Sequence, residues 1–457
     1  MDNYVFSKFN YYQHSCVSDN MIIYNSLQRR IIKLPDTDAK RIGICDNGSQ
    51  NPNIKYISSN DAIENKLIKY GIIVPKSYNE SAAAHLKYLE EITEPILRLT
   101  IVPTYRCNFR CPYCYQDHEH SIIMDEETQE AIIKYVRKHI SKYTAVEISW
   151  FGGEPLLCKD IIIRINSELK RICNDRYKQF KSSITTNGYG LTKDVFEKLL
   201  DVGVVRYFIT IDGLAPEHDR QRYLASKQGT FDTIIGNLLS IKSVAHTRRF
   251  VINIRSNLSK ENIDHYDDYL LYMDKQFSDD SRFAFFVRPV YDWGGESIDE
   301  FRENLLANKA EQLIMDKLLL SKCKLNYLEF FYDLTGYVTC YASKINCFII
   351  NPDGSINKCT CAETGGKNRI GQLLPSGDMI IDRSLMGEWC RQYDNSSNCS
   401  ECYMLGLCLK SYCVMPQVIR NERVRKCFIA KNICDKMLML LEKCDEKYEY
   451  IIDFTKE

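Results

Sequence analysis

The sequence predicts an α/β protein with a partial (β/α)6 barrel at its centre, a small α+β module before it and an irregular cysteine-rich region after it. Strand-like apolar runs alternate six times with helical patterns in the middle of the chain. Such near-continuous apolar strands separated by helices are typical of a parallel sheet covered by helices. Cysteines crowd the last part, where long helical patterns are scarce before Asn432. The expected parts are residues 1–90, 91–330 and 331–457.

The N-terminal module is expected to combine strands and helices. In chain order, its predicted elements are a strand over 21–26, a strand over 30–35, a helix over 36–44 and a helix over 60–75. Asp36 or Thr37 is expected to cap the first helix, and Asn60 or Asp61 the second, because these side chains accept bonds from free N–H groups. The polar stretch 76–81 is a candidate linker.

The central region repeats one strand–helix unit six times. Strands are predicted over residues 96–103, 146–151, 182–187, 204–211, 248–255 and 282–290. Helices are predicted over residues 126–140, 160–173, 194–203, 231–244, 260–276 and 301–320. In barrels of this kind the active site lies at the C-terminal ends of the strands.

Small or polar motifs follow the strands at that end. They are CNFRCPYC (107–114), GGEP (152–155), TTNG (185–188), IDG (211–213) and RSN (255–257). One such motif alone would be a turn, but five on successive units of one sheet face predict a site.

Composition excludes several classes of function. Sixty Lys and Arg balance sixty Asp and Glu, so no basic field favours nucleic acid. The apolar runs are shorter than the ~20 residues that a membrane helix needs, so no membrane partner is expected. No basic segment followed by an apolar one begins the chain, which predicts a reducing cytoplasmic location. Twenty cysteines in that compartment favour metal or cluster ligation over disulfides.

Three cysteines share one short segment. Cys107, Cys111 and Cys114 have the spacing C-x3-C-x2-C. Three thiolates in one loop can hold three irons of a [4Fe–4S] cluster, which leaves the fourth iron open to a substrate or cofactor. A zinc ion with three protein ligands and one open position remains the alternative.

The motifs together resemble the radical S-adenosylmethionine superfamily, in which these three cysteines bind the cluster and its open iron chelates S-adenosylmethionine. The resemblance implies that one electron cleaves the cofactor to a 5′-deoxyadenosyl radical, which takes a hydrogen atom from the substrate. Gly152, Gly153 and Glu154 match the family's glycine-rich motif, which by resemblance holds the methionine ammonium. Glycine allows close backbone approach to a ligand, although this tetrapeptide standing alone would be a tight turn.

Further strand-end motifs extend the resemblance. TTNG and TIDG (210–213) are similar to family motifs around the ribose and methionine, and HDRQR (218–222) is similar to the HDxxR pattern. By resemblance Arg222 and Thr210 meet the methionine carboxylate, which suits a bidentate guanidinium. A surface salt bridge is the alternative for Arg222. The other implied cofactor-binding residues are Thr186, Asn187 and Asp212, with Arg255 and Asn257 as further candidates.

The C-terminal region resembles the SPASM extension, which binds two auxiliary [4Fe–4S] clusters, so the resemblance implies three clusters in all. It implies an outer cluster on Cys399, Cys402, Cys408 and Cys427. It implies an inner cluster on Cys340, Cys359 and Cys413, with Cys347 as a candidate fourth ligand. The gap before Cys413 is four residues where the family has three, and Cys361, Cys390 and Cys434 are extra. The fourth inner ligand therefore stays open, and a substrate thiol is one alternative.

The N-terminal module resembles the winged-helix-like element that binds leader peptides in peptide-modifying enzymes. Such an element receives a peptide strand at a sheet edge. A structural cap on the barrel is the alternative.

The whole pattern implies a radical peptide maturase. Its expected partners are a ribosomal precursor peptide with a leader and an electron donor such as flavodoxin or ferredoxin. Its expected product is an oxidative cross-link, thioether or carbon–carbon, while the sequence does not assign a catalytic base. One alternative is a sulfatase-maturing enzyme that forms formylglycine, but that group commonly has Asp where Thr360 follows Cys359. The other is a non-catalytic zinc-binding interaction protein.

Overall fold

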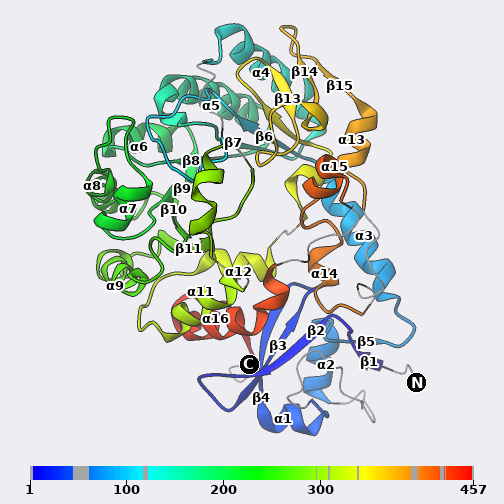
Figure 1. Cartoon of the computed structure of the whole chain (residues 1–457). Helices are drawn as coiled ribbons and strands as arrows, with labels where there is room; N and C mark the ends of the chain where they lie inside the picture. Colours follow the sequence, from blue (N-terminus) through cyan, green and yellow to red (C-terminus); the bar gives the residue numbers. More distant parts are fainter. Residues whose placement is uncertain are drawn as a thin grey trace.

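A computed structural model of the chain describes residues 4–44, 61–116, 122–294, 296–306, 309–336, 339–392, 399, 401–422, 427 and 429–454. These residues form three sheets, of ten, four and two strands. Figure 1 shows the barrel helices in an arc around the strands of the large sheet, with the small N-terminal sheets at the opposite end of the molecule. No helix in the described ranges is both long and apolar enough to cross a membrane.

Six parallel strands form the predicted partial barrel. They are β6 (Ile96–Ile101), β7 (Ala145–Trp150), β8 (Gln179–Thr186), β9 (Val204–Thr210), β10 (Val251–Leu258) and β11 (Phe283–Pro289). Their order in the sheet follows their order in the chain, and every neighbouring pair is parallel. The predicted α/β fold is therefore confirmed. Within the described residues the barrel is open, since β11 is an edge strand.

Amphipathic helices cover the outer side of these strands (Figure 1). They are α4 (Glu126–His139), α5 (Lys159–Asp175), α6 (Lys193–Asp201), α7 (Ala215–Gln221), α8 (Phe231–Lys242) and α9 (Tyr266–Phe277). Asp125 and Thr192 cap α4 and α6 with their side chains. The short helix α7 was not predicted, because seven polar-rich residues carry too little periodicity.

The helix predicted over 301–320 is shorter, because only α11 (Ala310–Leu320) falls within that range. A separate helix, α10 (Glu296–Phe301), and a 3-10 turn over Arg302–Asn304 precede it. A further helix, α12 (Leu328–Thr335), was missed by the sequence analysis.

Four short strands of the cysteine-rich region extend the same large sheet. They are β12 (Cys347–Ile350), β13 (Ser355–Asn357), β14 (Arg369–Leu373) and β15 (Met379–Ile381). The first of them runs parallel to β6, and the other three add on in antiparallel fashion. The sequence did not predict these strands, because β12 and β13 are buried at every position and show no alternation. The helices of this region are α13 (Arg383–Trp389), α14 (Leu405–Cys408), α15 (Met415–Arg420) and α16 (Cys434–Tyr448).

The N-terminal part contains the two predicted strands and more. Its elements are β1 (Tyr4–Phe6), β2 (Asn10–His14), β3 (Asn20–Asn25), β4 (Arg30–Pro35), α1 (Asp36–Arg41), α2 (Ala62–Lys69) and β5 (Ile73–Pro75). Asp61 caps α2 as expected, but α1 follows Pro35 without a side-chain cap. The helix predicted to reach residue 75 ends early, since Gly71 has a φ of 71° and the next residues pair with β1.

Two features tie the N-terminal module to the rest of the chain. The last strand, β16 (Ile452–Asp453), pairs in parallel with β4 and occupies one edge of the four-stranded sheet. The candidate linker 76–81 leads directly into α3 (Glu80–Ile92), where Arg29 forms an ion pair with Glu91. Thr339 also donates to the Glu91 carboxylate. The N-terminal module is thereby tied to the segment that precedes Cys340.

Candidate active site

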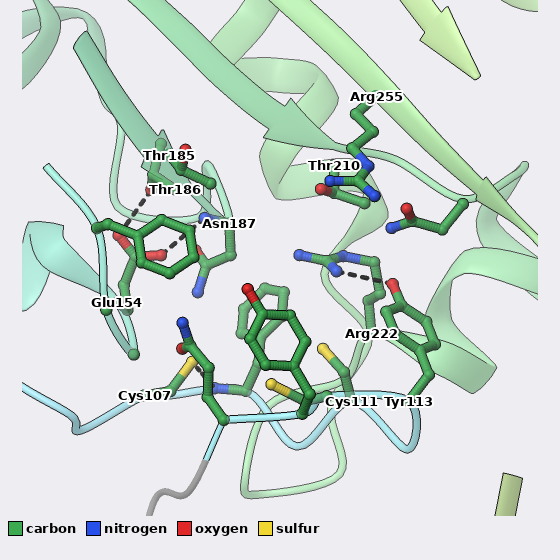
Figure 2. Close-up of a pocket in the computed structure, with 18 of the residues that line it drawn as sticks. Cys107, Cys111, Tyr113, Glu154, Thr185, Thr186, Asn187, Thr210, Arg222 and Arg255 are labelled. Atoms are coloured by element: carbon green, nitrogen blue, oxygen red, sulfur yellow. Dashed lines mark hydrogen bonds between the residues drawn. The ribbon is translucent and has the colours of Figure 1, made fainter. Parts of the chain in front are cut away.

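A pocket opens where the parallel strands end (Figure 2). It encloses about 950 Å³ including the part open to solvent. Residues from four of the five strand-end motifs line it, together with Thr210 at the end of β9 and several aromatic side chains. The lining residues are Cys107, Phe109, Cys111, Tyr113, Cys114, Tyr115, Gln116, Phe151, Gly152, Gly153, Glu154, Thr185, Thr186, Asn187, Thr210, Arg222, Arg255, Asn257, Val290, Tyr291 and Trp293.

The cysteine loop forms one wall of this pocket. Cys107, Cys111 and Cys114 follow β6 and all contribute to the lining. Backbone hydrogen bonds of 3.0 and 2.8 Å hold segment 108–110 against segment 223–225. A loop without helix or strand structure is thus fixed by pairing with the segment that follows the HDRQR motif.

Burial controls the protonation of these thiols. It raises the pKa of Cys107 to about 11 and that of Cys111 to about 12, and it also raises the pKa of Cys114. Because thiolates are the metal ligands, binding of a metal group here must release protons. In the described ranges no three His, Cys, Asp or Glu side chains converge closely enough to hold a single metal ion. A four-iron cluster is a wider arrangement, with each thiolate on a different iron.

The two glycines of the GGEP motif pack against the cysteine loop. A Cβ on Gly153 would lie 2.3 Å from the Arg106 carbonyl oxygen, and one on Gly152 would lie 2.6 Å from that of Thr104. Gly152 also has a φ of 122°, which side chains rarely adopt. We expected glycine at these positions because a ligand would come close to the backbone. The structure shows a second reason, which is that the cysteine loop itself packs closely against both glycines.

Glu154 joins the ends of two strands. Its carboxylate accepts hydrogen bonds from the Thr186 hydroxyl (2.6 Å), the Asn187 N–H (2.7 Å) and the Leu156 N–H (2.9 Å). Burial raises the pKa of Glu154, and these donors oppose that rise. Since a carboxylate has roughly four acceptor positions, one remains for a cation in the pocket.

Arg222 is a buried cation in the part of the pocket wall opposite Glu154 (Figure 2). Its guanidinium donates to the Tyr113 hydroxyl (2.8 Å) and lies 5.7 Å from the centre of the Phe109 ring. Its Nε is buried without a hydrogen-bond partner. Arg222 is only 8% exposed, so the surface salt bridge considered as its alternative is wrong.

Asp212 does not line the pocket but supports it from behind. Its carboxylate accepts from the Tyr113 hydroxyl and from the Asn257 N–H (2.7 Å). Desolvation raises the pKa of Asp212, opposed by the Arg222 charge. This carboxylate therefore positions Tyr113, and through it Arg222.

The HDRQR motif contains residues that stabilise the surrounding turns and one residue that lines the pocket. His218 accepts from the Asp212 N–H (3.2 Å) and lies 3.1 Å from the Thr230 hydroxyl. Asp219 accepts from the N–H groups of Thr230 and Phe231 at the start of α8. Burial holds the pKa of His218 well below its usual range. The first two residues of the motif thus fix the turns that carry the last one into the pocket.

Some lining residues were missed by the sequence analysis. Val290, Tyr291 and Trp293 follow β11 and close one side of the pocket. The rule that strand ends carry the site would have found them, because they come directly after the sixth predicted strand.

Three of the cysteines expected at the inner cluster lie near one another. Cys340 is near enough to Cys413 and Cys347 for their charges to act on its thiol, whose pKa burial raises to about 12. Cys359 is the largest influence on the thiol of Cys361 and lowers the pKa of Cys361 to about 7, while the pKa of Cys359 itself is raised well above its usual value.

Cys361, one of the extra cysteines of this region, reaches the pocket wall itself. The Cys361 sulfur lies 4.0 Å from the hydroxyl oxygen of Tyr115, which lines the pocket next to Cys114. The auxiliary cysteine region and the cysteine loop therefore meet at Tyr115.

The cysteines expected at the outer cluster lie farther along the chain. The Cys402 N–H donates to the Cys399 carbonyl (3.2 Å), and Cys408 is the last residue of α14. Cys427 is exposed.

Comparison with known sequences identifies the central region. Residues 101–272 match the family model of the Radical SAM superfamily. The chain is 23% identical over 439 residues to the radical SAM cyclopropyl synthase TigE of Paramaledivibacter caminithermalis, covering 88% of this chain and 87% of that protein. It is 32% identical over 136 residues to the GTP 3′,8-cyclase of Nautilia profundicola, covering 28% of this chain and 39% of that enzyme.

Comparison with solved structures shows a shared fold. The structure of native anSMEcpe with bound AdoMet and Kp18Cys peptide matches with a TM-score of 0.59 at 16% identity. The match covers 77% of this chain and 99% of that one.

Proposed function

The chain is a radical SAM enzyme, with residues 101–272 matching the family model of that superfamily, and we propose that it cross-links a ribosomally made peptide by oxidation. One observation carries the proposal. The cysteine loop, the Glu154 carboxylate and the buried Arg222 line one pocket, and Cys361 connects that pocket to the auxiliary cysteines. A cofactor site and an electron exit are thereby adjacent.

The donor set of the pocket fits the cofactors that the family implies. Cys107, Cys111 and Cys114 would hold a [4Fe–4S] cluster with one open iron. Glu154 would accept from the methionine ammonium of S-adenosylmethionine, and Arg222 with Thr210 would bind its carboxylate. The unpartnered Nε of Arg222 supports this assignment, because a buried donor without an acceptor is costly. When bound, this pair of cofactors supplies a carbon radical that removes a hydrogen atom from the substrate.

The auxiliary cysteines would take up the second electron. A cross-link removes two protons and two electrons from the substrate. The radical takes one of each as a hydrogen atom, and the second proton is released to solvent. We assign the other electron to two further [4Fe–4S] clusters, so that three clusters are bound in all. The outer cluster would use Cys399, Cys402, Cys408 and Cys427. The inner cluster would use Cys340, Cys347, Cys359 and Cys413. A flavodoxin or ferredoxin would supply and accept electrons, which suits a cytoplasmic location.

A peptide substrate is supported by two observations. The fold resembles that of anSMEcpe, which was solved with a bound Kp18Cys peptide. The N-terminal sheet has β2 at one edge, while β16 takes the other, and edge strands bind peptides by strand addition. We propose that β2 receives the leader of a precursor peptide.

A formylglycine-forming reaction is the second candidate. The residue after Cys359 is Thr360, and its hydroxyl lies 2.8 Å from that of Tyr341. That position therefore offers no carboxylate base, which favours cross-linking.

Co-expression tests the proposed reaction. The enzyme is produced with a short cysteine-rich peptide encoded beside its gene, and the peptide mass is measured. Loss of a pair of hydrogens per cross-link is expected, with fragment ions missing between the joined residues. An unchanged peptide, together with formylglycine in a sulfatase substrate, would favour the second candidate.

A further inference from the structure

Arg255 brings an unbalanced positive charge into the pocket. It lies near the C-terminal end of β10, beside Thr210 of β9 in the sheet register. Its Nε is buried and has no hydrogen-bond partner, and within the described residues its guanidinium has no ion pair. Arg255 is half-buried, and a cation partly withdrawn from water without a counter-ion is costly. An anion from outside the chain would remove that cost.

The acids near Arg255 are already engaged. Asp212 accepts from Tyr113 and from the Asn257 N–H, and it stands behind the wall. Glu154 is the one acid among the described lining residues, and it accepts three bonds at the ends of β7 and β8. Figure 2 shows Glu154 and Arg255 on opposite sides of the open space. The half of the pocket that contains Arg255 is therefore cationic.

Two guanidinium groups line the pocket, and their surroundings differ. Arg222 lies against Tyr113 and Phe109, next to the cysteine loop. Arg255 is close enough to Tyr115 and Cys361 for its charge to act on both. Arg255 thus faces the junction with the auxiliary region, which is where a substrate would lie between the radical and the electron exit.

We propose that Arg255 binds a carboxylate of the substrate, from an acidic side chain or from a peptide C-terminus. This proposal rests on the proposed function for its substrate class. It assigns the carboxylate of S-adenosylmethionine to Arg222 and that of the substrate to Arg255. A planar guanidinium suits either source, because it can donate two parallel hydrogen bonds.

Chemical labelling tests the proposal on the cluster-loaded enzyme. Phenylglyoxal modifies free arginines, and the adduct on Arg255 is quantified by peptide mass spectrometry. The probes are N-acetylglutamate N-methylamide for a side chain and N-acetylglycine for a C-terminus. Their neutral controls are N-acetylglutamine N-methylamide and N-acetylglycinamide. With S-adenosylmethionine present, we expect one carboxylate probe to slow labelling by about tenfold or more at saturation, as for a charge-assisted hydrogen bond. The neutral controls should have no effect, and the probe that protects identifies the source.

Variants separate the substrate carboxylate from that of the cofactor. Arg255→Gln should bind S-adenosylmethionine within about twofold of wild type, and Arg255→Lys should retain part of the probe binding. The matched control is Arg249→Gln, which removes an exposed arginine before the other end of β10. It should alter neither binding reaction.

Two results would overturn the proposal. One is protection of Arg255 by S-adenosylmethionine alone, with cofactor binding weakened about tenfold in Arg255→Gln. The other is equal labelling with and without both carboxylate probes. Deoxyadenosine formation is measured in the same preparations, so a failure of the proposed radical chemistry is seen separately from a failure of the Arg255 assignment.

Discussion

Residues of the sequence motifs divide into those that face the pocket and those that hold them. Arg222 and Glu154 line the pocket, whereas Asp212, His218 and Asp219 lie behind it. The supporting residues carry buried polar groups whose hydrogen bonds are satisfied inside the protein. Their removal should therefore act first on stability and only indirectly on chemistry.

His218 should make stability depend on pH. Its pKa in the folded state lies well below the unfolded value of 6.5, because burial disfavours the cation. The contribution of His218 to the free energy of unfolding is complete above pH 6.5. It is lost as the pH falls, because the unfolded chain then binds a proton on this residue that the folded chain excludes. The slope is at most about 1.4 kcal/mol per pH unit. Chemical unfolding of wild type and His218→Gln between pH 7.5 and 5 should show a wild-type advantage that shrinks in acid. A constant difference would contradict this assignment.

Gly153 should tolerate no side chain. The Gly153→Ala Cβ would meet the Arg106 carbonyl at 2.3 Å, and backbone cannot yield cheaply. We expect a loss of about 1–3 kcal/mol and weaker iron retention, as for other overpacked sites. Gly236→Ala is the matched control, because its Cβ would meet nothing within 4 Å in α8. The control should be neutral or slightly stabilising in thermal unfolding. Equal effects of both substitutions would refute the packing argument.

The site was predictable where residue type and strand end coincided. Cys107, Glu154 and Arg222 lie in segments that follow predicted strands, Thr186 lies at the end of one, and all four line the pocket. The sequence analysis also chose Asp212, which the structure places behind Tyr113. The distance of a residue from a strand end could not distinguish residues that line the pocket from residues that lie behind it. That distinction depends on the direction in which each side chain points.

At the scale of elements, the six barrel strands were predictable and the short strands added to the sheets were not. The six barrel strands are apolar runs of six to eight residues bounded by helices. By contrast, β13 and β15 have three residues each, and β16 has two. Such short pieces become strands through pairing with neighbours that are distant in the sequence, which no local pattern reports.

The contact between the N-terminal module and α3 gives an element-scale prediction. Arg29 and Glu91 are 9% and 1% exposed, so Arg29→Met leaves a buried carboxylate without its cation. We expect a loss of about 3 kcal/mol. The double variant Arg29→Met with Glu91→Leu should cost less than the sum of the single variants, by about 1–3 kcal/mol. Thermal unfolding measures this cycle.

An exposed pair is the control for that cycle. Lys198 and Asp194 form an ion pair on the surface of α6, and Lys198→Ala should leave the melting temperature unchanged. Additive single effects at Arg29 and Glu91 would mean that the buried pair does not couple the module to α3.

At the scale of the whole molecule, the N-terminal module is interlocked with the rest. Gly406 of α14 packs on the backbone of Leu27, and β16 pairs with β4. Deletion of residues 1–85 would remove both contacts, so it cannot test leader binding cleanly. Substitutions on the edge strand β2 are the better test of that role.

The auxiliary cysteines should be needed for product but not for cofactor cleavage. Cys399→Ala with Cys402→Ala should lower the iron content by about four atoms, one cluster. Deoxyadenosine should still form, because the cysteine loop is intact, while the cross-linked peptide should be lost. Iron analysis, deoxyadenosine assay and peptide mass are measured together. A variant that makes full product would restrict the outer cluster to a structural role.

The central claim is that radical chemistry begins at the cysteine loop. Its most direct test is deoxyadenosine formation by anaerobically reconstituted protein carrying Cys107→Ala, Cys111→Ala and Cys114→Ala. The control triple variant replaces cysteines outside the pocket, Cys16→Ala, Cys158→Ala and Cys323→Ala. The account predicts no deoxyadenosine from the loop variant, about eight irons still bound to it, and activity close to wild type in the control. Deoxyadenosine formation by the loop variant at the wild-type rate would contradict the account.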